Sequence, residues 1–190
     1  MEDRKRTIYD TAVRLFKAQG YHATSVKEIA DAVGLQKGSL YHYMSGKEDL
    51  LLEIARTAIT AYLADLERVR REDGTGREML SHLIRRHVER VTRDTDTITV
   101  LLREARSLSE KARSEIHGLT SRYTDGLAEI VEKGARDGSL AFADPALAAL
   151  AILGALNWMT QWYVPGGRLD PARIAELIDA LVLEGLRPRG

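Results

Sequence analysis

The sequence predicts an all-α protein of about nine helices, with a short N-terminal head of three helices and a larger helical body. Apolar residues recur at helical spacing along nearly the whole chain, as in the series Ile8, Ala12, Leu15 and Phe16. The alternation of apolar and polar residues that predicts β-strands does not occur in the sequence. Glycine stops, Ser-x-x-Glu capping boxes and Asp-Pro starts divide the 190 residues into segments of helical length.

Local signals delimit the three helices of the head, which we assign to residues 1–46. Gly20 ends the first helix, and Ser25 followed by Glu28 forms a capping box that opens the second. Gly34 ends the second helix, because glycine readily adopts the backbone conformation that follows a helix. A third helix, about seven residues long, is expected to start near residue 36.

The body, residues 47–190, follows from similar signals. Ser45 and Glu48 predict a second capping box and a long fourth helix over about residues 46–70, which the sequence DGTG at 73–76 stops. The last two helices begin with Asp-Pro, at 144–145 and 170–171, because Asp caps free amides and Pro needs no amide partner there. Between the fourth helix and these last two helices, further helices are expected over 77–93, 97–108 and 110–137.

Composition places the chain in a reducing compartment, and we expect a cytoplasmic protein. The sequence has no cysteine, and Met1 is followed by charged residues rather than by the apolar run of a signal peptide. Residues 146–164 carry no charge and approach the length of a membrane span. Because Asn157, Thr160 and Gln161 interrupt this stretch, a helix buried between other helices is the preferred interpretation, with no membrane partner.

The charge is unevenly distributed, although Lys and Arg balance Asp and Glu over the whole chain. Residues 1–47 hold eight Lys or Arg and five Asp or Glu, a net charge of +3, which leaves −3 for residues 48–190. A basic head on a mildly acidic body is compatible with a polyanionic partner that contacts the head.

Residues 24–44, TSVKEIADAVGLQKGSLYHYM, place two short helices around a glycine turn and predict a helix-turn-helix. Ala30 and Val33 are expected to face inward. The side chains expected to reach base edges in the major groove are Gln36, Lys37, Ser39 and His42. Those expected to hold phosphates are Thr24, Ser25, Tyr41, Tyr43 and Lys47, and the predicted surface also includes Lys27 and the small Gly38. The alternative is a solvated helical hairpin.

The stretch YHATSVKEIADAVGLQKGSLYHYMSGKEDLL, residues 21–51, closely resembles the DNA-binding head of the TetR/AcrR family of bacterial transcriptional regulators. The likeness runs from residue 3 to about residue 63. Met44, where the family usually has Phe, and Gly46, where it has Ser or Asn, are mild departures, since Met fills the same apolar pocket. The resemblance implies a homodimeric repressor on a near-palindromic DNA operator, with a helical body that binds a small ligand and then releases the DNA.

The segments LLREARSL (101–108) and LGALNWMTQWYVPGGRLDPARIAELIDALVLEGL (153–186) resemble the branch of this family that responds to acyl-CoA in catabolism. This resemblance implies a small hydrophobic effector, with an acyl-CoA as the candidate, and no further cofactor. The residues expected to bind it are Arg103, Arg106, Asn157, Trp158, Gln161 and Trp162. The two tryptophans could instead belong to a dimer interface, which is predicted to include Leu150, Leu153, Ile174, Ile178 and Leu181.

Other functions find little support in the sequence. The five histidines do not form a metal-binding pair at helical spacing, and we assign neither catalytic residues nor metal ligands. Two alternatives to an acyl-CoA-responsive repressor stay open. One is a repressor that responds to an uncharged drug or metabolite, and the other is a ligand-independent architectural DNA-binding protein, which would be expected to carry more positive charge.

Overall fold

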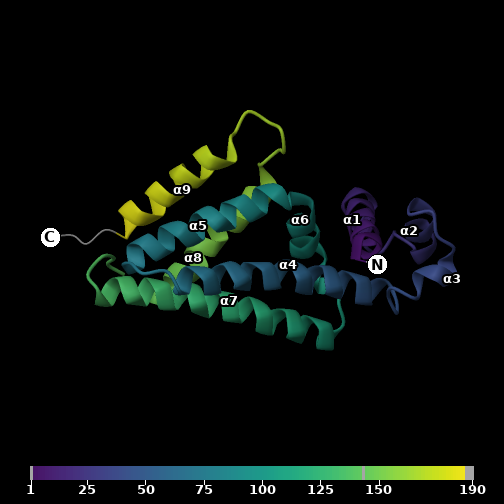
Figure 1. Ribbon diagram of the computed structural model, residues 1–190, viewed down its shortest axis with the longest axis horizontal. Coiled ribbons are helices and arrows are strands. Elements are labelled where there is room, and N and C mark those ends of the chain that lie inside the picture. Colours follow the sequence, from purple (N-terminus) through teal and green to yellow (C-terminus); the bar gives the residue numbers. More distant parts are fainter. Residues whose placement is uncertain (1, 143, 187–190) are drawn as a thin grey trace. The chain divides into compact units, whose positions relative to one another are not determined.

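The computed structural model describes residues 2–142 and 144–186, and over these residues the chain is all-α, as predicted (Figure 1). No β-strand occurs in this part of the chain. Its nine α-helices are α1 (Glu2–Gln19), α2 (Val26–Ala32), α3 (Lys37–Leu40), α4 (Lys47–Arg70), α5 (Gly76–Arg93), α6 (Thr95–Glu104), α7 (Glu110–Arg136), α8 (Pro145–Trp158) and α9 (Pro171–Gly185). Two short 3-10 helices follow α6 and α8, at Ala105–Ser107 and Met159–Gln161.

The chain packs as two compact units. The first contains residues up to 58 together with 96–118, and the second contains 59–95 together with residues from 119 onward. The division falls within α4 and within α7. Packing therefore groups α6 and the start of α7 with the head. The boundary after residue 46, between a DNA-binding head and a ligand-binding body, stays a prediction.

The first unit has its own apolar core. Ile8 and Phe16 of α1, Ile29 of α2 and Leu40 of α3 are completely buried, and Val100 of α6 joins the same cluster. Ala30 is also completely buried and Val33 nearly so, which confirms that both face inward. Short side chains at these positions let α2 approach its neighbours closely.

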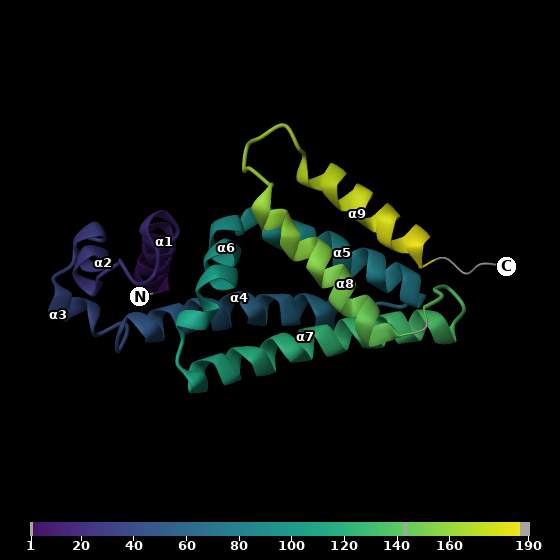
Figure 2. The ribbon, with the colours of Figure 1, turned by 180° about the vertical axis from the view of Figure 1, so that it is seen from behind.

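In the second unit α9 packs along α5, and α8 also packs against α5 (Figures 1 and 2). Ser81 of α5 donates a hydrogen bond of 2.9 Å to the buried Asp179 of α9. Gly126 of α7 lies so close to Leu66 of α4 that a Cβ atom at residue 126 would collide with the leucine side chain. Side-chain size at residue 126 thus sets how closely these helices approach.

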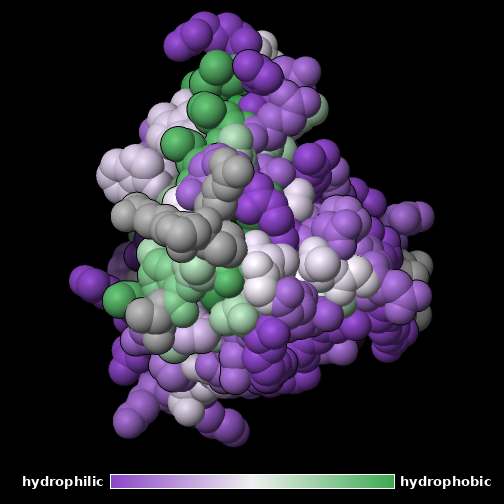
Figure 3. Space-filling model, turned by 90° about the vertical axis from the view of Figure 1, so that its left-hand side faces the viewer, coloured by the Kyte–Doolittle hydropathy of each residue, from purple (hydrophilic) through white to green (hydrophobic). Residues whose placement is uncertain are grey.

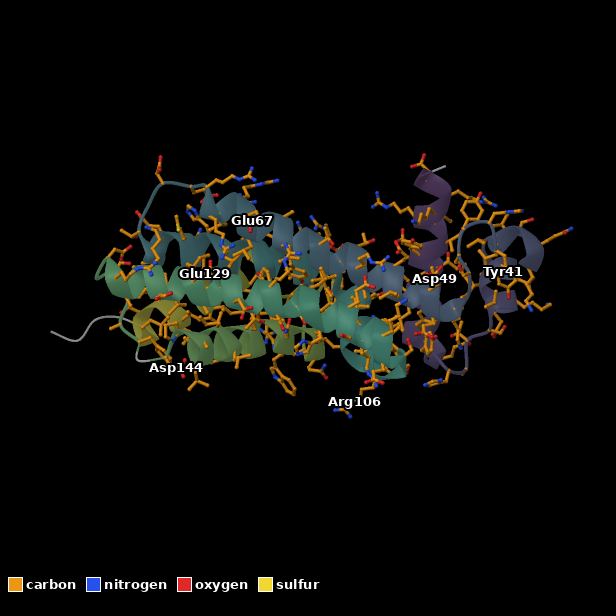
Figure 4. The ribbon with its side chains drawn as sticks, turned by 90° about the horizontal axis from the view of Figure 1, so that it is seen from below. Tyr41, Asp49, Glu67, Arg106, Glu129 and Asp144 are labelled. Atoms are coloured by element: carbon orange, nitrogen blue, oxygen red, sulfur yellow. The ribbon has the colours of Figure 1, made fainter. Side chains whose placement is uncertain are left out.

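Arg70 ties the same two helices together at the surface. It forms ion pairs with Glu67 of its own helix α4 and with Glu129 of α7, the two carboxylates labelled in Figure 4. Because all three side chains are partly exposed, we expect this network to contribute little to stability.

Three of the four helix caps predicted from the sequence form in the structure. The Ser25–Glu28 box forms in both directions, with distances of 3.1 and 2.7 Å. Asp144, labelled in Figure 4, accepts a hydrogen bond from the backbone amide of Leu147, and Asp170 accepts one from that of Ala172. These contacts confirm the two Asp-Pro starts.

The predicted box between Ser45 and Glu48 is wrong. The backbone amide of Ser45 donates instead to Asp49, at 2.9 Å, while Glu48 accepts from the backbone amide of Ser109, also at 2.9 Å. Ser109 precedes α7, where backbone amides lack partners within the helix, so it competes for the Glu48 carboxylate. Sequence spacing alone cannot reveal a competing donor 61 residues away.

Two further segments differ from expectation. The third helix covers four residues rather than seven, because beyond Leu40 the chain continues in turns, with bonds from His42 to Ser39 and from Tyr43 to Leu40. The charge-free stretch 146–164 is helical only as far as Trp158, continues as a 3-10 turn, and is buried on one face rather than all round. No helix in the described part of the chain is long and apolar enough to cross a membrane.

Candidate nucleic-acid interface and buried polar cluster

The turn between α2 and α3 is fixed by backbone bonds and one long side chain. Gly34 has φ +67, in the left-handed region, and the amide of Leu35 bonds back to the carbonyl of Ala30 at 2.9 Å. Arg4 of α1 donates to the carbonyl of Val33 at 3.2 Å. The start of α3 is therefore held in a defined position relative to α1 and α2.

The structure presents most of the predicted DNA-contacting residues at the surface. The exposed ones are Ser25, Lys27, Gln36, Lys37, Gly38, Tyr41 and His42. Ser39, Tyr43 and Lys47 are half-buried, and Thr24 is buried. Tyr41, labelled in Figure 4, is a large aromatic with 47% of its surface exposed, although α3 has a core to pack on. An exposed aromatic beside exposed Gln and Lys side chains suits a contact surface better than a solvated hairpin.

Thr24 has a structural role in place of the predicted phosphate contact. Its side chain is 1% exposed, and its hydroxyl donates to the carbonyl of Gly20 at 2.8 Å. The hydroxyl also accepts from the Gln19 amide at 3.3 Å. This threonine closes the turn between α1 and α2, so its side chain is not presented to a ligand.

Lys47 is similarly engaged inside the head. Its ammonium group donates to the carbonyl oxygens of Tyr21 and Thr24, at 2.7 and 2.8 Å, and more weakly to that of His22, at 3.3 Å. It also lies over the Tyr21 ring, 4.4 Å from the centroid. Because an ammonium group has three protons, these carbonyls use all of its donors. In this structure Lys47 links the start of α4 to the loop before α2. Its phosphate contact stays a prediction.

Helices α8 and α9 expose large apolar side chains. Leu150 is 59% exposed and Leu181 67%, as the dimer prediction requires, and Leu153 and Ile178 are half-buried. Ile174, in contrast, is 6% exposed and packs within its own chain, so it offers little surface to a second copy, and its place in the interface stays a prediction. Figure 3 shows hydrophobic side chains gathered in groups on the face of the molecule that it presents.

The predicted ligand-binding residues fall into two groups. Arg103 and Arg106 belong to the first unit and are exposed, and Figure 4 shows the Arg106 side chain extending away from the ribbon. Trp158, 66% exposed, Trp162, 40% exposed, and Gln161 belong to the second unit and lie at its surface. Their exposure favours an interface over an internal pocket for Trp158.

The sixth predicted residue, Asn157, lies beside a buried polar cluster that the sequence did not predict. Tyr62 of α4, His87 of α5 and Tyr123 of α7 place their rings together, with centroids 4.6 to 5.8 Å apart. All three side chains are more than nine-tenths buried. The Tyr123 hydroxyl is 3.0 Å from Nδ1 of His87, and Asn157 of α8 interacts with the same imidazole.

Two polar atoms of this cluster have no partner. Neither the Tyr62 hydroxyl nor Nε2 of His87 has a partner with hydrogen-bond geometry among the described residues, although both atoms are shielded from solvent. Asn157 acts on the imidazole electrostatically without meeting that geometry. Burial lowers the pKa of His87 to about 4, against the weaker opposing effect of Asn157, and raises the pKa of both tyrosines. The three side chains are therefore neutral at pH 7.

One charged pair lies next to the cluster. Arg90 of α5 lies 5.7 Å from the Tyr62 ring centroid and forms an ion pair with the buried Asp65 of α4. Its charge is thus already compensated. The helical pattern of α5 could have revealed that His87 is buried, because His87 stands four residues from Leu83 and from Val91 on the buried face.

Two family models match the chain. The model of bacterial regulatory proteins of the tetR family matches residues 8–54, and the model of the tetracyclin repressor-like C-terminal domain matches residues 73–186. The chain belongs to the tetR family. The resemblance predicted from the sequence is confirmed.

Individual relatives of this tetR-family chain are similar over nearly its full length. It is 27% identical over 185 residues to the HTH-type transcriptional repressor KstR2 of Rhodococcus jostii (strain RHA1), covering 96% of this chain and 91% of that protein. It is 25% identical over 181 residues to the fatty acid metabolism regulator protein of Bacillus subtilis (strain 168), covering 94% and 93%. Both proteins are named as regulators, not enzymes.

One similar solved structure contains both an acyl-CoA and operator DNA. The crystal structure of AibR in complex with isovaleryl coenzyme A and operator DNA matches this tetR-family chain with a TM-score of 0.84 and 31% identity, over 94% of this chain and 97% of AibR. These relatives are consistent with the acyl-CoA-responsive branch of the family.

Proposed function

We propose that the protein is a homodimeric transcriptional repressor that leaves its DNA operator when an acyl-CoA thioester binds the helical body. The likeness to AibR, whose structure holds isovaleryl coenzyme A and operator DNA, is the observation that carries this proposal. A repressor with these ligands acts in the cytoplasm, where DNA and acyl-CoA are found.

The head supports operator binding through its exposed residues. Gln36, Lys37 and His42 stand on and beside α3 with their polar groups unburied, and Gln and Lys side chains match the edges of adenine and guanine. Ser25, Lys27 and Tyr41 flank them and could hold phosphates. Two such heads in a dimer would read a near-palindromic site.

The C-terminal helices support the dimer. Leu147 and Leu150 of α8 and Leu177 and Leu181 of α9 are each at least 58% exposed, which is unfavourable for a monomer in water. Pairing these helices with those of a second copy would bury the leucines together with Trp158 in a four-helix interface. We therefore propose Trp158 as an interface residue rather than a ligand contact.

An acyl-CoA combines an apolar chain with a polyanionic nucleotide. Arg103 and Arg106 are exposed cations that could meet the phosphates, and burying the acyl chain would contribute about 0.8 kcal/mol per methylene. The alternative effector is an uncharged hydrophobic drug or metabolite, which would have no use for these arginines.

The test starts from an operator selected by the full-length protein from a random DNA library. Release of that operator is then followed by fluorescence anisotropy while acyl-CoAs of increasing chain length, the matching free acids and neutral hydrophobic drugs are added. We expect the CoA thioesters alone to release the DNA, and Arg106→Ala to require more of them. Arg122→Ala, an exposed arginine on α7, serves as the control.

The other outcomes are informative. Release by free acids or neutral drugs as effective as by thioesters would replace the acyl-CoA with the alternative effector. DNA binding that no small molecule changes would favour a ligand-independent architectural protein. Failure to select any DNA sequence would contradict the repressor itself.

A further inference from the structure

The buried cluster of Tyr62, His87 and Tyr123 holds polar atoms that the fold does not use. Buried hydroxyl and imidazole groups nearly always have hydrogen-bond partners in native proteins, because an unpaired one keeps the full cost of leaving water. The Tyr62 hydroxyl and Nε2 of His87 lack such partners, and the centroids of their rings are 4.6 Å apart. Two unsatisfied groups on neighbouring rings indicate that a third molecule completes the site.

The hydrogen-bonding character of the two atoms can be assigned. Phenol is a stronger hydrogen-bond donor than imidazole, so we assign the bond of 3.0 Å as Tyr123 donating to Nδ1 of His87. The neutral ring then carries its proton on Nε2, which faces the missing partner as a donor. The Tyr62 hydroxyl is a second donor. The site therefore offers two N–H or O–H groups to an acceptor.

The surroundings select a neutral acceptor. The side chains of the cluster are uncharged at pH 7, and Arg90, the cation beside the Tyr62 ring, is already paired with Asp65. A free carboxylate placed here would lose its hydration without gaining a free cation. A carbonyl oxygen has two lone pairs, costs far less to bury, and can accept from both donors at once.

We propose that Tyr62 and His87 recognise a neutral carbonyl group of the effector, such as that of an acyl thioester. The rest of the effector that enters the second unit is apolar. Tyr123 acts as a positioning residue that fixes the proton of His87. This inference deepens the proposed function and rests on it for the ligand-responsive body. It adds a reason why a thioester would be distinguished from the free acid.

The test measures ligand affinity of the full-length protein by calorimetry, without DNA, using two ligand pairs that differ in the carbonyl. The first pair is hexanoyl-CoA and its thioether analogue S-hexyl-CoA, and the second is 2-octanone and octane. One hydrogen bond in a buried site corresponds to roughly tenfold in affinity, so we expect wild type to bind hexanoyl-CoA at least about tenfold more tightly than S-hexyl-CoA.

Tyr62→Phe should reduce this preference to a few-fold or less while leaving the affinity for S-hexyl-CoA unchanged. Because the hydroxyl has no partner in the fold, the same change should not lower the melting temperature of the ligand-free protein. Tyr9→Phe is a matched control, since the Tyr9 hydroxyl is also buried without a partner but lies in the first unit. It should keep the full preference.

Each other outcome decides a specific point. If hexanoyl-CoA binds but Tyr62→Phe keeps the preference, or the thioether binds equally well, the carbonyl site is wrong and the acyl-CoA repressor stands. If neither CoA compound binds but 2-octanone is preferred over octane and Tyr62→Phe removes that preference, the site stands and the acyl-CoA effector is wrong. If no pair is discriminated, or Tyr62→Phe lowers the melting temperature as loss of a buried water contact would, the inference is overturned.

Discussion

His87 is the residue whose chemistry the fold changes most. Its pKa falls to about 4 because burial disfavours the charged imidazolium, whereas in the unfolded chain it titrates near its ordinary value of 6.5. Between these two values the unfolded state binds more protons than the folded state. The protein should therefore lose stability as the pH falls from 6.5 towards 4. Above pH 6.5, where His87 is neutral in both states, it should not make stability depend on pH.

The expected size of this effect follows from the shift. Between pH 7.5 and pH 5 wild type should lose about 2 kcal/mol of unfolding free energy through His87 alone. Urea unfolding of wild type and of His87→Gln at both values measures it, since the variant cannot titrate at this position. Equal pH dependence in the two proteins would contradict a neutral buried His87.

Lys47 is expected to act on stability before it acts on DNA. Lys47→Met keeps the apolar stem but leaves the carbonyls of Tyr21 and Thr24 without their donor, so it should cost about 1–3 kcal/mol of unfolding free energy. Lys27→Met, which removes an exposed ammonium paired with Asp31, should leave the unfolding free energy close to that of wild type. An unchanged stability together with weaker DNA binding would restore the phosphate contact predicted from the sequence.

The sequence indicates chemistry at single residues only when neighbours along the chain determine it. Ser25 caps α2 through Glu28, three residues away, and this was predictable. Glu48, Thr24 and Lys47 bond to groups that the fold brings to them, so sequence reasoning assigned them other roles. The polar cluster was missed because its members come from three helices.

At the scale of the element, the short helix α3 should determine operator sequence preference. Gln36→Ala and Lys37→Ala should each cost about 1–3 kcal/mol of binding free energy at particular base pairs, because their side chains would contact base edges. Competition binding against operator variants with single base-pair changes measures this preference. Arg122→Ala should leave it unchanged. If both head variants bind all operators as wild type does, α3 is not the reading helix.

The elements themselves were largely predictable, apart from their ends. Helical periodicity and the Asp-Pro starts placed α8 and α9, and the glycine at residue 34 placed the turn before α3. The end of α3 was not predictable, because the turns at residues 41–43 compete closely with a further helical turn. Likewise, the capping box of Thr75 and Glu78 at the start of α5 was not predicted, because the sequence DGTG at 73–76 was interpreted only as the end of the fourth helix.

At the scale of the whole molecule, a repressor of a near-palindromic operator requires two copies of the chain. Leu181→Glu should convert the dimer into monomers at micromolar concentration, since pairing would bury a carboxylate without a partner. Leu102→Glu is the matched control, because Leu102 is also an exposed leucine, at 51%, but lies on α6. Light scattering gives the mass of each protein. A monomeric wild type, or a Leu181→Glu dimer, would contradict the interface.

Operator and effector must also influence each other in both directions. If an acyl-CoA weakens operator binding by a given factor, operator DNA must weaken acyl-CoA binding by the same factor. The most direct measurement is therefore the affinity of hexanoyl-CoA for the dimer, determined by calorimetry with and without saturating operator. We expect the affinity to fall by about five- to 150-fold when operator is bound, the usual range of such coupling. Equal affinities in the two titrations would show that the ligand and the DNA do not communicate, and would contradict a repressor released by its effector.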